Sequence, residues 1–294
     1  MKSILLVLGE RSYRKPLLDA VAALRAGERA DLHVVFLSGP RPAGEADTDG
    51  PPAPGEVPAA SVGRVPWCEP SAIVERARAL GVDLVALAPE LPAGGGPLWL
   101  DPSVVRVAAE AEQAVLVFRG SESWPPRKVV LPLDGEDAAA DTLGRAWGWL
   151  DALFGPSEGS ADAPPELHVL QAAADMDRWH ELRSSLEARA GTLPGTRRVR
   201  LTSCMRFGTA PGRRVLRWVD QEAPDLLVLG RTRAPAERRA AWLRVLCGAS
   251  CPVLLLPFGP ARGDPPRRIG GGPVRRRLPR LRPAGGTGEL LPSA

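Results

Sequence analysis

The order of apolar segments along this chain occurs twice, with the two copies about 140 positions apart. LHVV at 32–35 has a counterpart in LHVL at 167–170, and DLVALA at 83–88 has one in DLLVLG at 225–230. Each copy is long enough to close a hydrophobic core of its own. The repeat therefore indicates a duplicated domain and excludes a solenoid of short units.

Short apolar runs without charges recur in both copies, and they are the candidate strands. Such runs are typical of strands that are buried on both faces of a parallel sheet. Between them lie segments with helical spacing of apolar residues, and this alternation produces βαβ units. We expect an α/β protein made of two tandem, doubly wound, Rossmann-like domains, each with its own five-stranded parallel sheet and its own core. The clearest runs are 4–8, 84–88, 115–118, 226–229 and 253–256.

Three helices follow from the pattern. Ser71 is a suitable N-cap and Gly81 a suitable C-terminal stop for one of them. A second helix is predicted from Asp175 to Gly191, whereas the same interval of the first copy, 39–60, is rich in Pro, Gly and acidic residues and predicts no helix. A third has an apolar stripe at i, i+3, i+4, i+7 and i+10, formed by Leu143, Ala146, Trp147, Leu150 and Leu153.

These segments predict domains at 1–119 and 127–258, a linker at 120–126 and a disordered tail at 259–294. In the repeat, Val7, Val34, Val85 and Val115 are expected to correspond to Val130, Val169, Leu227 and Val253. The tail has eight arginines against Asp264 and Glu289, a net charge of +6, whereas the whole chain has a net charge of +4. A tail of this kind predicts weak, salt-sensitive contact with polyanions.

Other chemistry is poorly supported by the sequence. No P-loop, zinc signature, nucleophile elbow or dinucleotide-binding glycine motif is present. His33 and His168 stand mid-strand, where packed histidines are more common than catalytic ones. Cys68 and Cys204 follow the third strand of each copy, where thiol sensing is conceivable but burial is the simpler interpretation. We expect a bacterial, cytoplasmic protein that has no membrane span and is not an enzyme.

The second-strand sequence LHVV, the fourth-strand sequence DLLVLG and the fifth-strand sequence CPVLLLP resemble the universal stress protein family in its tandem form. The resemblance covers roughly 1–120 and 127–258. It implies five-stranded parallel sheets that pair through their fifth strands as an internal pseudo-dimer, and it leaves a further homodimer open. Some members of the family bind ATP, and in this chain Pro132 and Asp134 correspond to the end of the first strand near the adenosine.

Nucleotide-binding members resemble one another in a loop after the fourth strand, Gly-x2-Gly-x9-Gly-Ser/Thr. Its glycines let backbone N–H groups approach phosphates, and its last pair begins a helix whose N-terminus favours anions. The first copy has Ala88, Leu91 and Asp101-Pro102 at the glycine positions, and its first strand ends at Gly9 instead of an acidic residue. We therefore expect the first copy not to bind ATP.

The second copy keeps Gly230 but has Arg233 in place of the next glycine, and the closing pair aligns with Arg239-Ala240, four residues too early. Arginines can clamp phosphates through paired hydrogen bonds, so an anion site remains possible. The alternative is a solvated basic loop. The candidate site for ATP or another anion consists of Pro132, Asp134, Gly230, Arg231, Arg233 and Arg239, and no cofactor is required.

The sequence thus predicts a regulatory or adaptor protein of the stress response that acts on an unknown protein partner without strong ATP binding. Two alternatives remain open at this stage. One is an ATP-binding regulator that uses only the second domain, and the other is a polyanion-binding protein that uses its basic tail.

Overall fold

The computed structural model describes 3–9, 30–38, 61–66, 69–88, 102–119, 124–133, 138–154, 166–172, 180, 183–184, 187–188, 199–205, 211–231 and 236–257. The chain divides into a compact unit at 1–259 and a second unit at 260–294, which lies outside the described residues. The two predicted domains belong to the same unit, so their boundaries at 119 and 127 stay predictions.

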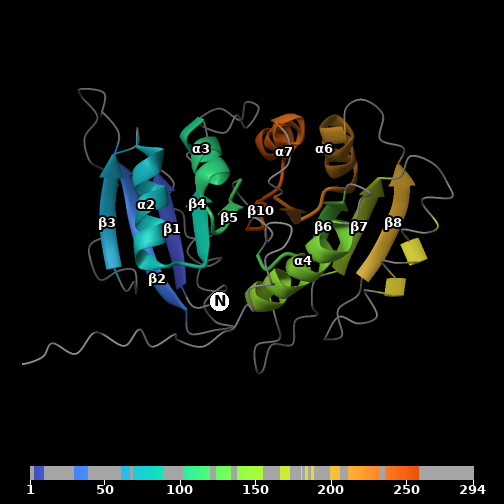
Figure 1. The fold of residues 1–294 in the computed structure, drawn as a ribbon, viewed down its shortest axis with the longest axis horizontal. Coiled ribbons are helices and arrows are strands. Elements are labelled where there is room, and N and C mark those ends of the chain that lie inside the picture. Colours follow the sequence, from blue (N-terminus) through green and yellow to red (C-terminus); the bar gives the residue numbers. More distant parts are fainter. Residues whose placement is uncertain are drawn as a thin grey trace, which may run out of the picture. The chain divides into compact units, whose positions relative to one another are not determined.

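The first half of the chain supplies five strands and two described helices (Figure 1). They are β1 (Ser3–Gly9), β2 (Asp31–Ser38), β3 (Ser61–Pro66), α2 (Pro70–Leu80), β4 (Leu84–Ala88), α3 (Pro102–Glu110) and β5 (Ala114–Val117).

The second half repeats this order, and a long helix is described after its first strand, whereas the corresponding interval of the first half, 10–29, lies outside the described residues. Its elements are β6 (Lys128–Leu133), α4 (Ala138–Phe154), β7 (Glu166–Ala172), β8 (Val199–Met205), α6 (Pro211–Glu222), β9 (Leu226–Leu229), α7 (Ala236–Gly248) and β10 (Val253–Leu255).

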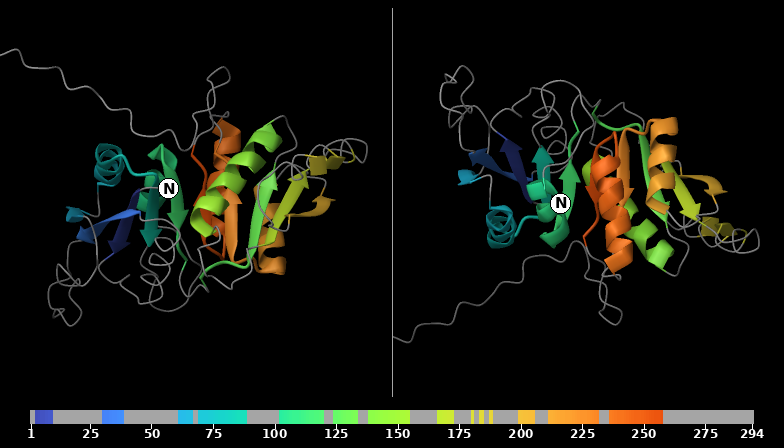
Figure 2. Two further views of the ribbon diagram at one scale, coloured as in Figure 1. Left: turned by 90° about the horizontal axis from the view of Figure 1, so that it is seen from below. Right: turned by 90° about the horizontal axis from the view of Figure 1, so that it is seen from above.

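All ten strands form one sheet, in the order β3-β2-β1-β4-β5-β10-β9-β6-β7-β8. Neighbouring strands are parallel within each half, and the one antiparallel pair among them is β5 with β10, which lie side by side at the middle of the sheet (Figure 2). The α/β fold class is confirmed. The expectation of two separate sheets is wrong, because the unpaired edges of β5 and β10 would otherwise remain open and here satisfy each other.

The pairing of β5 with β10 has the pattern of a two-fold axis. Leu116 lies opposite Leu254, Val115 opposite Leu255 and Val117 opposite Val253. Within the halves, Val85 pairs with Val115 and Leu227 pairs with Val253, so β5 and β10 occupy equivalent positions. The contact between the halves is therefore isologous, like that of a symmetric dimer, although one chain supplies both sides.

One predicted correspondence between the halves is wrong by two positions. Asp83 bonds to the backbone of Ser3, and Asp225 bonds in the same way to Lys128, so Ser3 and Lys128 are equivalent. This register places Val7 opposite Pro132 in the repeat, and Val130 corresponds instead to Leu5. Both first strands begin at these equivalent residues, and an apolar run matches several registers equally well, so the apolar pattern alone does not determine the alignment.

Two apolar layers cover the two faces of the sheet. On one face, α4 packs through the predicted stripe and Trp149; on the other, α2, α3, α6 and α7 pack against residues from both halves. Each layer is continuous across β5 and β10, so the halves share their core. Trp124, from the predicted linker, packs between Phe118 and Phe154 with ring centroids 5.5 and 5.2 Å away.

Helix boundaries follow the local sequence, with one correction. α2 begins at Pro70, and Glu69 occupies the N-cap without a side-chain hydrogen bond, so Ser71 lies in the first turn and is not the cap. Proline fits the first helical position because it has no N–H to leave unsatisfied. Gly81 ends α2 in the left-handed conformation, as predicted, with φ 63°. The interval 39–60 and most of 175–191 lie outside the described residues.

Candidate functional site

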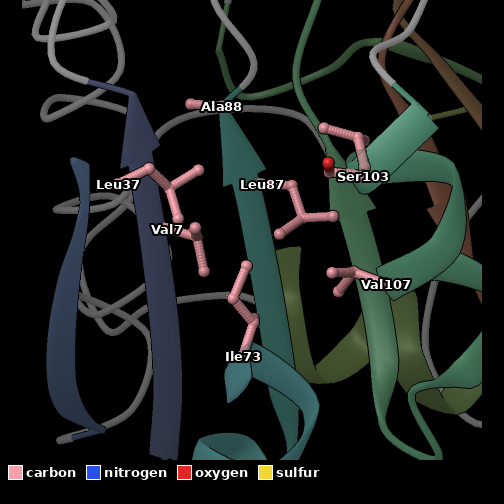
Figure 3. A pocket seen from close by; sticks show the side chains of 8 residues that line it. Val7, Leu37, Ile73, Leu87, Ala88, Ser103 and Val107 are labelled. Atoms are coloured by element: carbon pink, nitrogen blue, oxygen red, sulfur yellow. The ribbon is translucent and has the colours of Figure 1, made fainter. Parts of the chain in front are cut away.

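The carboxyl ends of parallel strands are where α/β proteins usually bind ligands. In the first half, Val7, Leu37, Leu87 and Ala88 lie in the carboxyl-terminal parts of their strands and line a small hollow, and Ser103 at the start of α3 also lines it (Figure 3). The cavity volume is about 10 Å³, room for roughly one water molecule. The remaining lining residues, Ile73, Val104 and Val107, are apolar.

This hollow contains no charged side chain among the described residues, and Ser103 is its one polar side chain. Ala88 stands at the first glycine position of the nucleotide loop, while Leu91 and Asp101 lie outside the described residues. Phosphates need donors or positive charge, and the described lining supplies neither beyond one hydroxyl. The lining suits apolar contact better than nucleotide binding.

In the second half, the structure brings two candidate residues to the same edge of the sheet. Pro132 lies in β6 and is half-buried, and Gly230 follows β9, the neighbouring strand. Asp134 and Arg233 lie outside the described residues. Arg239 lies in α7, and its side chain is not described. The complete set is therefore not placed together by the described residues.

Gly230 allows a close approach between β9 and α4. A Cβ atom at this position would lie 2.7 Å from Cγ2 of Thr142, a buried residue of α4. Such a contact is shorter than van der Waals packing permits, so any other residue here would require Thr142 or its surroundings to move. Packing with Thr142 is thus sufficient to explain the glycine, whether or not a nucleotide binds nearby.

Arg231, the next residue, is fully buried with 0% exposure. Its Nε donates to Leu256 O at 2.6 Å, its Nη1 donates to Ala108 O at 3.0 Å and Ala111 O at 2.6 Å, and its Nη2 donates to Gln113 O. Three of these four carbonyls belong to the first half. The guanidinium is therefore held at the contact between the halves, and not on the solvated loop where an anion ligand was expected.

The surroundings of Arg231 are cationic. Burial and, to a smaller extent, the neighbouring charge of Arg145 together lower the pKa of Arg231 to about 10. Arg145 donates to Pro257 O at 2.8 Å and pairs with Asp141 at 3.0 Å. A pKa of about 10 still leaves Arg231 charged at neutral pH, so the carbonyl oxygens must stabilise a buried cation.

Arg119 makes the reciprocal contact from the first half. It follows β5, is 4% exposed, and donates from Nη2 to Leu246 O in the last turn of α7. Arg231 donates to Ala108 O in the last turn of α3. Neither helix has a basic residue in its own last turn, where carbonyls lack partners and the helix dipole is negative. Each half therefore supplies the cation that caps a helix of the other half.

The sequence did not identify Arg119, Thr142 or Arg145 as important. A signal for Arg119 was available: it directly follows an apolar strand, a place where a charged side chain is buried only if it has partners. Because Arg119 was assigned to the last position of the first domain, next to the linker, its burial was not predicted.

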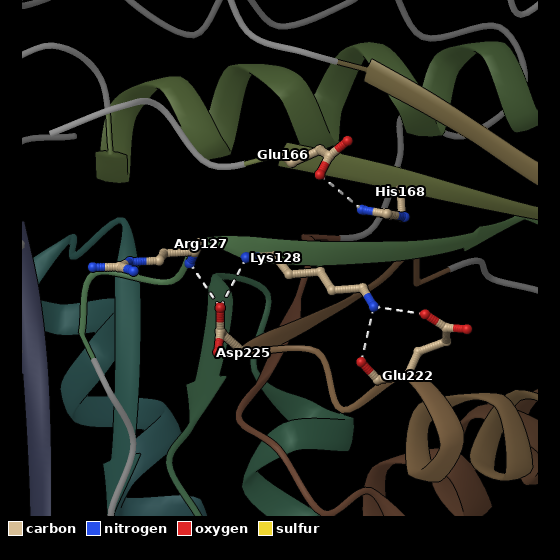
Figure 4. A network of polar contacts seen from close by, with 6 residues as sticks. All are labelled: Arg127, Lys128, Glu166, His168, Glu222 and Asp225. Carbon is tan, nitrogen blue, oxygen red and sulfur yellow. Dashed lines mark hydrogen bonds and ion pairs between the residues drawn. The ribbon is translucent and has the colours of Figure 1, made fainter.

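A second polar network lies at the amino ends of the strands, away from the predicted site (Figure 4). Asp225 accepts from the backbone N–H groups of Arg127 and Lys128 at 2.8 Å each. Lys128 Nζ donates to the carboxylate of Glu222 at 2.7 Å and to its carbonyl at 2.8 Å. The hydrogen bond and charge of Lys128 lower the pKa of Glu222. Asp83 repeats the contact of Asp225 in the first half, which explains the aspartate in both copies of the repeat.

The histidines and cysteines form no catalytic group among the described residues. His168 is 5% exposed and lies 3.3 Å from Glu166, while His33 is half-buried in β2 and His180 is exposed. Cys204 lies inside β8 instead of after it, and Cys68 is outside the described residues. In the described part of the chain, no cluster of three potential metal ligands occurs, and no helix is long and apolar enough to cross a membrane.

Comparison with known proteins identifies the fold. No protein-family model matches the sequence, and no curated protein matches it. A universal stress protein from Pseudomonas aeruginosa UCBPP-PA14 is 14% identical, with a TM-score of 0.61 over 87% of this chain and 92% of that chain. One from Archaeoglobus fulgidus DSM 4304 is 12% identical, with a TM-score of 0.59 over 86% of this chain and 97% of that chain. The chain therefore has the fold of the universal stress proteins.

Proposed function

We propose that this chain is a cytoplasmic regulatory or adaptor protein of the stress response, in which two universal-stress-protein-like domains act as one body without strong ATP binding. The fold supports the family, and the shared core supports a single rigid body. In this proposal the protein acts through a partner and not through catalysis.

The observation that carries this proposal is the position of Arg231. It begins the loop that would wrap the phosphates, and its guanidinium is fixed between α3 and β10 by four carbonyl oxygens. A loop anchored in this way at its first residue, and four residues shorter than the nucleotide-binding pattern, has little freedom to enclose a triphosphate. Nucleotide binding is then not the main activity of the site.

Native mass spectrometry of the purified full-length chain tests the proposal. We expect the mass of the chain alone, and calorimetric titration should give an ATP dissociation constant weaker than about 1 mM. A stoichiometric nucleotide retained through purification, or an ATP dissociation constant in the micromolar range, would show that the chain is a nucleotide-binding protein.

The alternative is a nucleotide-binding regulator that uses only the second half. The placement of Pro132 and Gly230 on the neighbouring strands β6 and β9 favours it. In that case Arg233 and Arg239 would replace the lost backbone donors, and their double substitution by alanine should abolish ATP binding. Each charge-assisted hydrogen bond contributes about 1.5–3 kcal/mol, so the loss would exceed about 100-fold. ATP binding that survives the double substitution would exclude this version of the site.

A further inference from the structure

Helices α6 and α7 pack closely enough to present one continuous surface. A Cβ atom on Gly212 of α6 would lie 3.0 Å from Ala241 O of α7, and one on Gly248 of α7 would lie 2.7 Å from Leu216 of α6. At the far end of the contact, Ser250 donates to Asp220 at 3.4 Å. We call the exposed surface along the contact between these two helices the α6–α7 seam.

Three exposed arginines border this seam. Arg213 and Arg217 lie one turn apart on α6, in the stripe that continues to Asp220 at i+7. Arg244 is exposed on α7, between Ala241 and Gly248, the two residues that approach α6. Within the described ranges no carboxylate pairs with any of the three. Leu216, half-buried, lies among them on the same side of α6.

The first half provides an internal comparison, because α2 and α3 correspond to α6 and α7. Gly81 and Ala223 end α2 and α6 in the same left-handed conformation, which aligns Ser71 with Arg213 and Glu75 with Arg217. β5 follows α3 and β10 follows α7, and Val115 of β5 is equivalent to Val253 of β10. Arg106 and Arg244 each lie nine residues before these positions, so they are aligned with each other.

The equivalent seam of the first half is not basic, because glutamates accompany its arginines. Arg106 pairs with Glu110 at 2.8 Å, and Arg78 lies 4.0 Å from Glu112. In the second half the counterpart of Glu110 is Gly248, and the counterpart of Glu75 is Arg217. The same fold in the same chain therefore does not require a basic seam, and an arginine-rich composition alone would affect both halves alike.

We propose that the α6–α7 seam is a docking surface for an acidic segment of a partner protein. This deepens the proposed adaptor function and rests on it. Guanidinium groups bind carboxylates through paired, charge-assisted hydrogen bonds. Arg213 and Arg217 are separated by about 6 Å along the helix axis, which matches carboxylates placed at i and i+4 on a partner helix.

An acidic protein segment fits this seam better than a nucleic acid does. Leu216 offers an apolar contact at the centre of the charges, and such a contact is useful to a partner with apolar side chains but not to a phosphate backbone. Nucleic acid binding usually engages about six or more phosphates along an extended basic track. Three arginines within about two helical turns make a compact patch instead.

The test uses the full-length chain and two fluorescent probes of equal formal charge. One is a synthetic helical peptide of about 20 residues with Glu at i and i+4 around leucines, and the other is a single-stranded DNA oligonucleotide. The seam variant is R213S/R217E, which introduces the residues found at the equivalent positions of the first half. The control variant, R276S/R277E, makes the same charge change in the tail.

Fluorescence anisotropy at about 0.15 M salt should show that the peptide binds the native chain at least about 10-fold more tightly than the seam variant and within about 2-fold of the control variant. Arg244→Gln, on the other helix, should weaken peptide binding about 3-fold and keeps the test valid if the double variant fails to fold. Thermal unfolding of each variant establishes that it is folded.

Three results would overturn the proposal. They are no peptide binding to the native chain, equal losses in the seam and control variants, or tighter binding of the oligonucleotide with the same dependence on Arg213 and Arg217. ATP is not a component of this experiment. A negative result in the peptide-binding experiment would therefore leave the proposed function standing, because that function is tested by the nucleotide retained through purification.

Discussion

At the scale of single residues, two buried arginines make hydrogen bonds across the contact between the halves. Arg231 and Arg119 come from different positions in their repeats, after β9 and after β5, yet they cap the equivalent helices α3 and α7 of the opposite half. Their partners are carbonyl oxygens and not carboxylates. Such a contact can be replaced only by another long donor, because an apolar side chain would leave buried carbonyls without partners.

Replacing Arg231 with leucine should lower the free energy of unfolding by about 2–4 kcal/mol, because several buried carbonyls lose their donor at once. Urea denaturation of the full-length chain measures this change. Arg76→Leu, at an exposed position on α2, is the matched control and should change the stability by no more than about 0.5 kcal/mol. Equal effects of the two substitutions would mean that Arg231 does not hold the halves together.

The Lys128–Glu222 pair gives a dependence on pH. The folded-state pKa of Glu222 is lowered by the hydrogen bond from Lys128 and by its charge. A lowered carboxyl pKa contributes stability above the unfolded value near 4.5, and this contribution is lost as the pH falls through the folded value. The melting temperature of Glu222→Gln should therefore lie below that of the native chain at about pH 7 and approach it below about pH 4. A difference that grows on acidification would contradict the assignment.

At the scale of elements, comparison of the two halves shows where local sequence and fold disagree. Gly81 ends α2 with φ 63°, and Ala223 ends α6 with φ 43° at the equivalent position. A side chain in the left-handed region costs about 1–2 kcal/mol, which the second copy tolerates and the first avoids.

Exchanging these two residues should produce opposite effects. Gly81→Ala should lower the free energy of unfolding by about 1 kcal/mol, since nothing lies within 4 Å of the added Cβ atom and only the backbone conformation is strained. Ala223→Gly should raise it by up to about 1 kcal/mol for the same reason. Chemical denaturation measures both, and changes of the same sign would show that the helix ends are not equivalent.

Gly230 tests the packing of β9 against α4. Gly230→Ala should destabilise the chain by about 1–3 kcal/mol because its Cβ atom would overlap Thr142 Cγ2. Thr142→Ser removes that methyl group and keeps the hydroxyl, so the double variant should regain much of the loss. Gly148→Ala, in α4 with nothing within 4 Å, is the control and should be neutral or stabilising. No rescue by Thr142→Ser would show that Gly230 is needed for a reason other than this contact.

The sequence predicted most elements because their causes are local. The strand runs, the apolar stripe of α4 and the glycine at the end of α2 each follow from neighbouring residues. Arg231 was misplaced because a Gly-Arg pair at the end of a strand has the same appearance whether the arginine enters solvent or an interface. What decides its place is α3 of the other half, more than 100 residues away.

At the scale of the whole molecule, the pairing of the two fifth strands was expected and is present as β5 with β10, but the single ten-stranded sheet that this pairing produces was not predicted. Neither strand contains a signal for the other beyond an apolar edge, and an apolar edge equally suits a second chain. The pairing of β5 with β10 also brings Arg119 and Arg231 to the opposite half and makes the two apolar layers continuous across the halves. It also makes the two halves comparable position by position, which is what reveals the uneven charge of the α6–α7 seam.

The pairing of β5 with β10 is thus the feature on which the proposals depend, and native-state hydrogen exchange tests it directly. The amides of Val117 and Val253, which lie opposite each other and face the contact between β5 and β10, should exchange only through global unfolding. Their protection should equal that of Leu6 and Leu131, which lie in β1 and β6 at the centre of each half. If Val117 and Val253 exchange through a separate opening that leaves Leu6 and Leu131 protected, the halves are independent domains and not a single body.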